Sequence, residues 1–178
     1  IRKYCETCMG RKYGKPMMII YPGEYYVSSK DEYIATVLGS CISVCLHDSE
    51  TKISGMNHFM LPGKITEKDR FTKDEISSRY GISAIKNLIE SMYRNGAMKN
   101  NLKAKIFGGG NVIDLNRPQG PVAEGNIRLA RIMVELEDIP IVLEDIGGKA
   151  TRKIIMEAKT GKVFLRRMGK NEKGDEDL

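Results

Sequence analysis

Apolar runs alternate with turn residues through the first third of the chain. Residues 17–27, "MMIIYPGEYYV", hold two apolar runs separated by a Pro-Gly pair, which predicts a strand, a turn and a second strand. Residues 33–47 and 53–61 are also apolar and β-branched enough to form strands. The polar segment "DSETK" between them has turn chemistry, so these two stretches are expected to form a hairpin. The polar text at 62–76 predicts an exposed loop.

Two helical patterns interrupt the strands. Apolar residues recur at the spacing of one helix face at Ile82, Ile85, Leu88, Ile89 and Met92. Gly96 is a suitable C-terminal stop for this helix. A second helix is expected over roughly 123–136, ending before Pro140.

Further strands are predicted around and after the second helix. "KAKIFGGG" (103–110) is predicted to be a strand that ends in glycines. After the second helix, "IPIVLEDIGG", "RKIIMEAK" and "KVFLRRM" are predicted to be three more strands. The segment "KTGK" joins the last two as a hairpin loop. Because strands dominate, the fold class is α+β, with a sheet-rich core and helices packed on one side.

Length and composition indicate one ordinary domain. The chain has 178 residues, of which 17–168 are expected to form the domain. Residues 1–16 read as a basic, turn-rich extension, and 169–178 as a polar, disordered tail. No window approaches eighteen apolar residues, and the first residues lack the apolar core of a secretory signal, so we expect no membrane insertion.

The cysteine content and the net charge give only general information about the compartment and the partners of the protein. Four cysteines are too sparse for a disulfide scaffold in a chain of this size, so a reduced, cytoplasmic protein is expected. The net charge of +6 favours acidic partners, but the lysines and arginines are spread along the whole chain. Basic stretches such as "MGRKYGK" are explained by solvated faces, and no nucleic-acid partner is expected.

Cys41 and His58 are the candidate catalytic pair. If a four-residue loop closes the hairpin and pairs His47 with Lys52, Cys41 lies opposite His58, with Cβ atoms about 5 Å apart. A slip of one residue would place the two on opposite faces. Cys45 shares the face of Cys41 but falls about 13 Å from His58 at 3.3 Å per residue. His47 would sit, solvated, at the edge of the loop.

Such a pair suits nucleophilic chemistry. A neighbouring imidazole can take the thiol proton and leave an ion pair. Attack of the thiolate on a carbonyl generates an oxyanion, which requires backbone N–H donors. Gly39 and Ser40 precede the cysteine where the chain can bend and present such donors. The alternative is that Cys41 is a small core residue, because free cysteine is among the most buried residue types.

The sequence around both residues also resembles a known family. "VLGSCISVCLHD" followed by "GMNHFMLP" closely resembles the chemotaxis chemoreceptor glutamine deamidases, the CheD family. The resemblance continues in "KIFGGGNV" and in "RKIIMEAKTGKVFLRRM", and it covers roughly residues 18–168. It implies a layered α/β/β sandwich with mostly antiparallel or mixed sheets and two main helices, related to deamidase toxins that use cysteine and histidine.

The resemblance also implies an activity. Cys41 is then the nucleophile and His58 the base of a protein-glutamine glutaminase that needs no cofactor or metal. Its substrate is the cytoplasmic domain of a methyl-accepting chemoreceptor, whose glutamines become glutamates through a thioester. A CheC-type phosphatase is an expected second partner.

Two positions depart from the family pattern. The family's third catalytic residue is a threonine six residues before the cysteine, where this chain has Ala35, and Thr36 comes one residue later. Because neighbouring strand residues face opposite sides, Thr36 is expected to reach His58 only if a bulge re-aims it. Otherwise a backbone carbonyl or water orients His58. In addition, "EGN" (124–126) lacks the arginine that relatives carry before the asparagine.

A zinc-binding adaptor is the competing hypothesis. The four cysteines, Cys5, Cys8, Cys41 and Cys45, could in principle supply the four thiolates of a structural zinc site in a module without catalysis. The second pair, however, lies inside an apolar strand, whereas zinc ligands of this type usually lie on turns. The glycine run in "FGGGNV" lacks the lysine and hydroxyl residue of a phosphate-binding P-loop, and a turn at a strand end explains it better.

Overall fold

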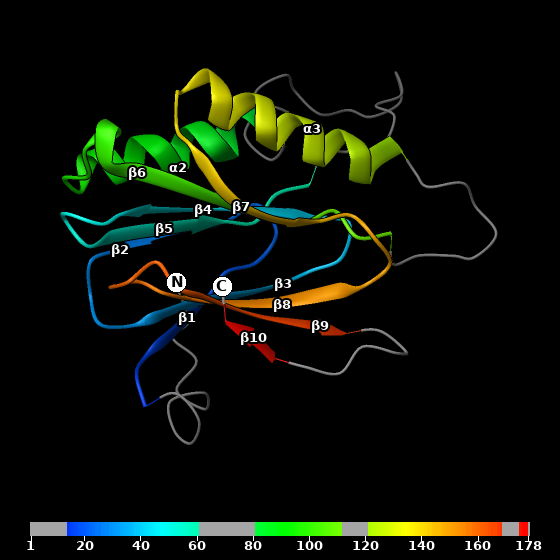
Figure 1. Ribbon diagram of the computed structural model, residues 1–178, viewed down its shortest axis with the longest axis horizontal. Coiled ribbons are helices and arrows are strands. Elements are labelled where there is room, and N and C mark those ends of the chain that lie inside the picture. Colours follow the sequence, from blue (N-terminus) through cyan, green and yellow to red (C-terminus); the bar gives the residue numbers. More distant parts are fainter. Residues whose placement is uncertain (1–13, 61–80, 112–120, 169–174, 178) are drawn as a thin grey trace.

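Two five-stranded sheets are stacked face to face, and helices cover the outer face of one of them (Figure 1). The structure, a computed structural model, describes residues 14–60, 81–111, 121–168 and 175–177. The first sheet has the order β1 (Met17–Ile19), β3 (Tyr33–Leu38), β8 (Thr151–Glu157), β9 (Val163–Met168) and β10 (Asp175–Asp177). The second has the order β2 (Tyr25–Ser28), β5 (Ile53–Asn57), β4 (Ile42–Asp48), β6 (Leu102–Gly108) and β7 (Ile141–Ile146).

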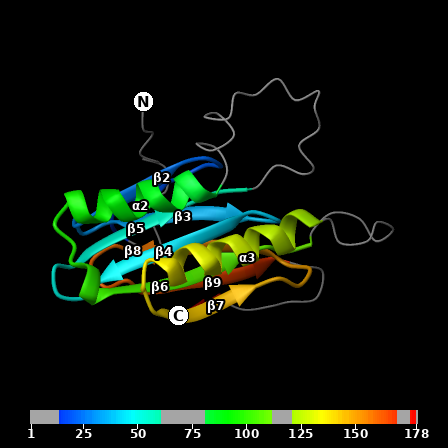
Figure 2. The ribbon, with the colours of Figure 1, turned by 90° about the horizontal axis from the view of Figure 1, so that it is seen from above.

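The helices α2 (Ile82–Arg94) and α3 (Pro121–Leu136) lie side by side across the second sheet (Figure 2). A short 3₁₀ helix, η2 (Lys99–Asn101), leads into β6. Helix α2 packs on β2 and β5, and α3 packs on β4, β6 and β7. Most strand pairs are antiparallel, while β1 with β3 and β6 with β7 are parallel. The predicted α+β class and layered α/β/β arrangement are therefore confirmed. Within the described ranges, no helix has the length and apolar character needed to cross a membrane.

Strand β4 contributes to both apolar layers. Ile42, Val44 and Leu46 point toward the helices, where they join a core with residues of α2 and α3. Cys45 points the other way, into a second core between the two sheets that also contains Met56. This alternation follows from the two-residue period of a strand. The layer between the sheets, called here the inter-sheet layer, is where the candidate residues meet.

The first helix agrees with its predicted face in all but one position. Ile85, Leu88, Ile89 and Met92 are buried, whereas Ile82 is 46% exposed at the start of the helix. Gly96 adopts φ 100°, the left-handed conformation expected of a glycine that ends a helix.

The predicted single strand over 33–47 is wrong. Strand β3 ends at Leu38 and belongs to one sheet, while β4 begins at Ile42 and belongs to the other. Residues 39–41 carry the chain across the inter-sheet layer between them. Apolar residues continue on both sides of this crossover, and the Gly39–Ser40 pair, where the sequence already allowed a bend, is the local sign of the break.

The predicted hairpin exists, but with a different register. Asp48 pairs with Ile53, so the loop comprises residues 49–52 and not 48–51. The carboxylate of Asp48 accepts hydrogen bonds from the backbone N–H groups of Glu50 and Thr51 at 2.9 and 3.0 Å, which starts the turn one residue later than expected. Lys52 closes the loop at φ 58°.

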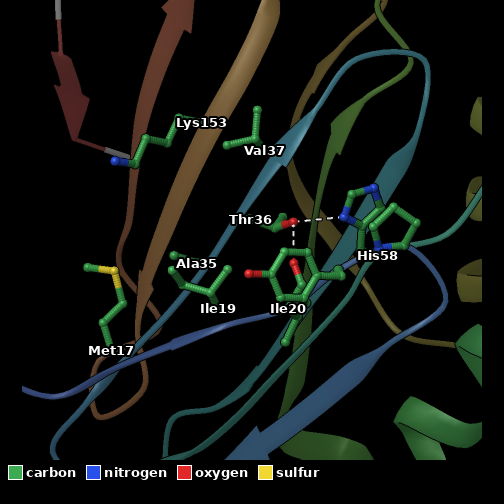
Figure 3. Close-up of a pocket in the computed structure, with 10 residues that line it drawn as sticks. Met17, Ile19, Ile20, Ala35, Thr36, Val37, His58 and Lys153 are labelled. Atoms are coloured by element: carbon green, nitrogen blue, oxygen red, sulfur yellow. Dashed lines mark hydrogen bonds between the residues drawn. The ribbon is translucent and has the colours of Figure 1, made fainter. Parts of the chain in front are cut away.

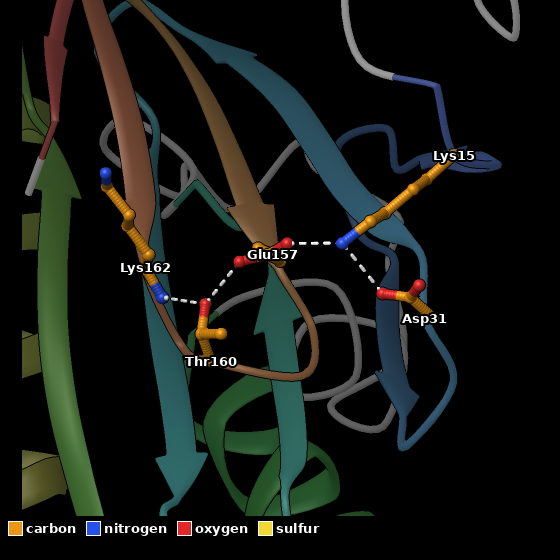
Figure 4. Close-up of polar contacts among 5 residues, drawn as sticks. All are labelled: Lys15, Asp31, Glu157, Thr160 and Lys162. Carbon is orange, nitrogen blue, oxygen red and sulfur yellow. Dashed lines mark hydrogen bonds and ion pairs between the residues drawn. The ribbon is translucent and has the colours of Figure 1, made fainter.

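The chain segments outside the predicted domain are partly described. The loop expected at 62–76 and residues 1–13 lie outside the described residues. The carbonyl of Pro16 accepts a hydrogen bond from the backbone of Tyr33, and Lys15 forms ion pairs with Asp31 and Glu157 (Figure 4). At the other end, the expected disorder is wrong for Asp175–Asp177, which pairs with β9.

Candidate active site

Cys41 lies at the crossover between the sheets, and the end of β6 holds its backbone. Gly109 donates its N–H to the carbonyl of Cys41, and Gly110 donates to that of Gly39, each at 2.8 Å. Gly108 has φ 110°, and a Cβ built on it would lie 2.1 Å from the Cys41 carbonyl oxygen. The glycine run is thus a strand-end turn, as predicted, and its lack of side chains is what lets it approach the cysteine loop.

A third contact comes from Asn126, which the sequence did not single out as a site residue. This fully buried side chain on α3 donates its amide N–H to the carbonyl of Ser40 at 2.9 Å. In a trans peptide the C=O and N–H groups point in opposite directions, so this contact turns the N–H of Cys41 away from α3. A buried asparagine on the apolar face of a helix is the signal that could have identified it.

The thiol of Cys41 is only partly buried. Burial raises its pKa, and the backbone N–H of Cys41 itself partly offsets this effect. During attack on a carbonyl the negative charge develops on the carbonyl oxygen, and the N–H of Cys41 is a candidate donor to it.

His58 is held by Thr36, as Figure 3 shows. The Thr36 hydroxyl donates to the carbonyl of Ile20 at 2.9 Å and lies 2.7 Å from Nδ1 of His58. Because its one proton is used, the hydroxyl accepts from Nδ1–H, which assigns the tautomer and leaves Nε2 unprotonated. Nε2 is buried and has no hydrogen-bond partner among the described residues. Burial lowers the pKa of His58 to about 4, so the ring is neutral at pH 7.

The hypothesis that Thr36 points away from His58 is wrong. Ile34 and Leu38 point into the inter-sheet layer, and Thr36, two residues from each, shares their face. Ala35 lies on the outer face of the same sheet, packed with Met17 and Ile155. The pairing of β3 with β8 is regular, so no bulge is needed for Thr36 to face His58, and no water or backbone carbonyl is required in its place.

Cys41 and His58 share a face without lying directly opposite each other. Ile42 bridges Phe59, so the residue opposite Cys41 in this register is Met60, two positions beyond His58. A shift of two residues preserves the face, unlike a shift of one. In the structure no hydrogen bond joins the two, because Nε2 of His58 has no partner among the described residues. The predicted shared face is confirmed, while the predicted directly opposed pairing is wrong.

Cys45 and His47 lie in more enclosed surroundings than Cys41 and the predicted loop edge. Cys45 is 1% exposed, and burial raises its pKa to about 12. His47 is partly buried, and its Nδ1 lies 2.8 Å from the hydroxyl of Ser54, so the prediction that it is merely solvated is wrong. Cys45 pairs with Met56, in the middle of a sheet. Cys41 is therefore the more accessible thiol of the two.

Comparison with known proteins identifies the family. Residues 60–167 match the family model described as "CheD chemotactic sensory transduction". The chain belongs to the CheD family. A relative from Janthinobacterium sp. (strain Marseille) is 40% identical over 158 residues, covering 89% of this chain and 76% of the relative. One from Hahella chejuensis is 41% identical over 155 residues, covering 87% and 72%. Both are named "Probable chemoreceptor glutamine deamidase CheD".

In this CheD-family chain a pocket of about 310 Å³ adjoins the histidine (Figure 3). Thr36 and His58 form part of its wall, and most of the remaining lining is apolar. Tyr21 and Val37 on its rim are 57% and 49% exposed. Lys153 supplies a positive charge at its margin. The arrangement offers an apolar surface with one cation beside Thr36 and His58, and Cys41 is not among the residues that line it.

The competing zinc site is poorly supported by the spacing of the thiols. Cys41 and Cys45 are four residues apart, about 13 Å at 3.3 Å per residue, whereas two thiolates on one zinc each lie about 2.3 Å from the ion. Cys5 and Cys8 lie outside the described residues. Among residues the structure does describe, no group of three His, Cys, Asp or Glu side chains could hold a metal ion.

Proposed function

We propose that this CheD-family protein is a chemoreceptor glutamine deamidase, a hydrolase that converts glutamine side chains of a receptor's cytoplasmic domain to glutamate. The observation that carries the proposal is the state of His58: Nδ1 is tied to Thr36, and the buried Nε2 is left open on the face it shares with Cys41. The printed names of the relatives support the substrate class. The family model matches residues from 60 onward, so the roles of Thr36, Cys41 and His58 rest on geometry.

The reaction begins with a neutral pair. Burial raises the pKa of Cys41 and lowers that of His58, so the thiol keeps its proton until substrate arrives. As the sulfur attacks the carboxamide carbon, Nε2 of His58 takes the thiol proton. The amide oxygen becomes an oxyanion and accepts a hydrogen bond from the N–H of Cys41, in the loop that Gly39 and Ser40 form.

The second half releases product. The imidazolium of His58 gives its proton to the leaving nitrogen, so ammonia departs and a thioester to Cys41 remains. Neutral His58 then takes a proton from water, whose oxygen attacks the thioester and displaces the thiol. The proton returns to the sulfur, and glutamate is formed. Water is the only co-reactant, and these steps use no metal or organic cofactor.

Thr36 has a positioning role in this scheme. Its hydroxyl keeps the proton of His58 on Nδ1 and fixes the ring plane, so that the lone pair of Nε2 stays directed into the site. When the ring becomes cationic, the same hydroxyl stabilises it by accepting from Nδ1–H. The apolar pocket beside His58 suits the apolar side chains that flank a glutamine on a receptor helix. A cytoplasmic location and a CheC-type phosphatase as second partner belong to the same proposal.

Mass spectrometry tests the proposal directly. Purified protein is incubated with a receptor cytoplasmic fragment in water enriched in ¹⁸O, and peptides are examined for glutamines converted to glutamate. The thioester route places one ¹⁸O in each new carboxylate. A Cys41→Ala variant with an unchanged melting temperature serves as the control. Unlabelled receptor after incubation with folded, wild-type protein would overturn the proposal.

A further inference from the structure

A second pocket, of about 410 Å³, opens at the other end of the inter-sheet layer. His47, Lys52, Lys103, Lys105 and Lys159 line it, and Cys45 and Met156 form an apolar floor. Strand β4 runs from Cys41 toward this end, so Cys45 in the pocket floor lies about 13 Å and His47 about 20 Å from Cys41 at 3.3 Å per residue. It is called here the basic pocket.

Two of its lysines occupy an unusual place. Lys103, Lys105 and Phe107 lie on one face of β6, and Phe107 belongs to the apolar inter-sheet core. Along this face of β6, an apolar core side chain at Phe107 is therefore followed by two lysines toward the basic pocket. Lys105 is partly buried, its ammonium donates to the carbonyl of Gly161 at 3.1 Å, and burial lowers its pKa. A cation in such a position costs free energy unless a negative partner offsets it.

The edge of the sheet is also irregular at this point. Ala104 pairs with Ile141 and Lys105 with Leu143, so Val142 is an extra residue on β7. It is 51% exposed and lines the basic pocket. Bulges of this kind often lie beside sites where they re-aim a side chain.

No aspartate or glutamate appears among the residues that line the basic pocket in the described part of the chain. The carboxylate of Asp48 accepts from the backbone N–H groups of Glu50, Thr51 and Met98. Glu157 instead meets Lys15 and the Thr160 hydroxyl, with Asp31 beside them (Figure 4). The nearby acids are thus already committed elsewhere.

The pKa of His47 reflects its burial and the lysines that surround it in the basic pocket. The pKa of His47 is lowered by burial and by Lys52, while Asp48 opposes the shift and Lys105 and Lys103 add to it. Its Nδ1 is engaged by Ser54, whose hydroxyl donates to the carbonyl of Ala158 at 2.6 Å. Nδ1 therefore carries the proton in the neutral ring, and Nε2 is an acceptor. When the ring is cationic, Nε2–H becomes a further donor.

We propose that the basic pocket binds a small organic phosphate, a ligand class that nothing in the deamidase chemistry requires. Four lysine residues line the pocket and no carboxylate does, which suits a ligand of two or more negative charges. The apolar floor of Cys45 and Met156 suits an organic moiety attached to the phosphates. The volume falls within the range of about 300–1,000 Å³ that is usual for small-molecule sites.

Isothermal titration calorimetry at low salt tests the site with two probes, inorganic pyrophosphate and ADP. Both probes are expected to bind, with ADP tighter because its organic part reaches the apolar floor. The double variant Lys103→Gln, Lys105→Gln should weaken binding by about tenfold or more, as expected for the loss of charge-assisted contacts. Lys105→Arg should retain most of the affinity, which a general loss of folding would not permit.

Two controls separate this site from non-specific charge and from catalysis. Lys86→Gln removes one positive charge from an exposed position on α2, half the change made by the double variant, and should change the affinity less than twofold. Cys41→Ala, which removes the proposed nucleophile, should bind both probes like the wild type. The inference is overturned if neither probe binds at millimolar concentration, or if Lys86→Gln weakens binding as much as the double variant does. Failure of deamidation alone leaves this result unaffected.

Discussion

The inter-sheet layer contains two cysteine–histidine pairs that are alike at the imidazole and different at the sulfur. In one pair the Thr36 hydroxyl donates to the carbonyl of Ile20 and meets Nδ1 of His58 at 2.7 Å. In the other the Ser54 hydroxyl donates to the carbonyl of Ala158 and meets Nδ1 of His47 at 2.8 Å. The same logic of one hydroxyl proton assigns both rings the same tautomer.

The sulfur atoms have opposite surroundings. Cys45 lies inside β4, almost completely buried, and its pKa is raised to about 12. Cys41 lies before β4, at the crossover, where it is partly exposed and has its own N–H beside the sulfur. An oriented imidazole is therefore present twice, while an accessible thiol is present once. In the proposed mechanism this difference makes the crossover, more than the histidine, the feature that sets the site apart.

The largest expected effect separates the two sulfurs. Cys41→Ala should lower deamidation by at least about 10³-fold, because no nucleophile remains. Cys45→Ala should keep turnover and cost only about 1 kcal/mol of stability from the small cavity. Receptor deamidation and thermal unfolding of both variants provide the measurement. A Cys45→Ala protein that melts normally but is inactive would contradict the comparison.

Replacing the two histidines sharpens the comparison at the base. His58→Gln should reduce kcat by about 10²–10⁴-fold, the usual contribution of a general acid–base group. His47→Gln should leave kcat unchanged, since His47 faces the basic pocket. Turnover on one receptor fragment, with circular dichroism to check folding, distinguishes them. Equal losses in both variants would show that the pairs are not functionally distinct.

The hydroxyls that orient the rings give the next smaller effect. Thr36→Val removes the hydroxyl with little change in shape and should lower kcat about 10–100-fold, because His58 loses its fixed orientation. Thr36→Ser should recover most of the activity. Ser54→Ala, the matched change at His47, and Ala35→Thr, on the outer face, should both leave kcat near the wild-type value. Wild-type turnover in Thr36→Val would remove Thr36 from the site.

The smallest effect concerns stability as a function of pH. The pKa of His58 falls from 6.5 to about 4 on folding, so the unfolded chain binds the proton more tightly. Stability is therefore retained above pH 6.5 and is lost as the pH falls toward 4, by an amount on the order of 3 kcal/mol. Urea unfolding at pH 7, 5.5 and 4.5 should show that His58→Gln loses less stability over this range than the wild type. Parallel curves for the two proteins would contradict the burial of a neutral ring.

The elements were predictable from the sequence, but the way they meet at the site was only partly so. Helix α2 and strands such as β8 follow from local periodicity, which a single chain displays directly. At the crossover, Gly39 and Ser40 indicate a bend, but the apolar pattern that resumes in β4 does not show that the chain changes sheets there. Thr36 consequently appeared to point the wrong way, when its face was assigned without knowledge of the second sheet.

The register between β4 and β5 is the second feature that the local sequence pattern does not determine. The carboxylate of Asp48 caps the hairpin turn and moves the pairing by two residues, a choice of turn geometry that several loops of similar composition could make. Cys41 remains on the predicted face of the hairpin because the register differs from the predicted one by two residues, an even number. The contact from Asn126 joins residues far apart in the chain, so it emerges only from the packing of α3 on the sheet.

The three carbonyl contacts at the crossover have a consequence for the order in which the chain is made. The groups that hold Gly39, Ser40 and Cys41 come from Gly110, Asn126 and Gly109, which leave the ribosome long after the cysteine does. A nascent chain that ends before α3 carries the thiol, the histidine and both glycines but lacks Asn126, so the carbonyl of Ser40 is not yet held. The crossover is therefore completed late in synthesis, and a chain that stops short of α3 carries the proposed nucleophile without the last contact that positions its loop.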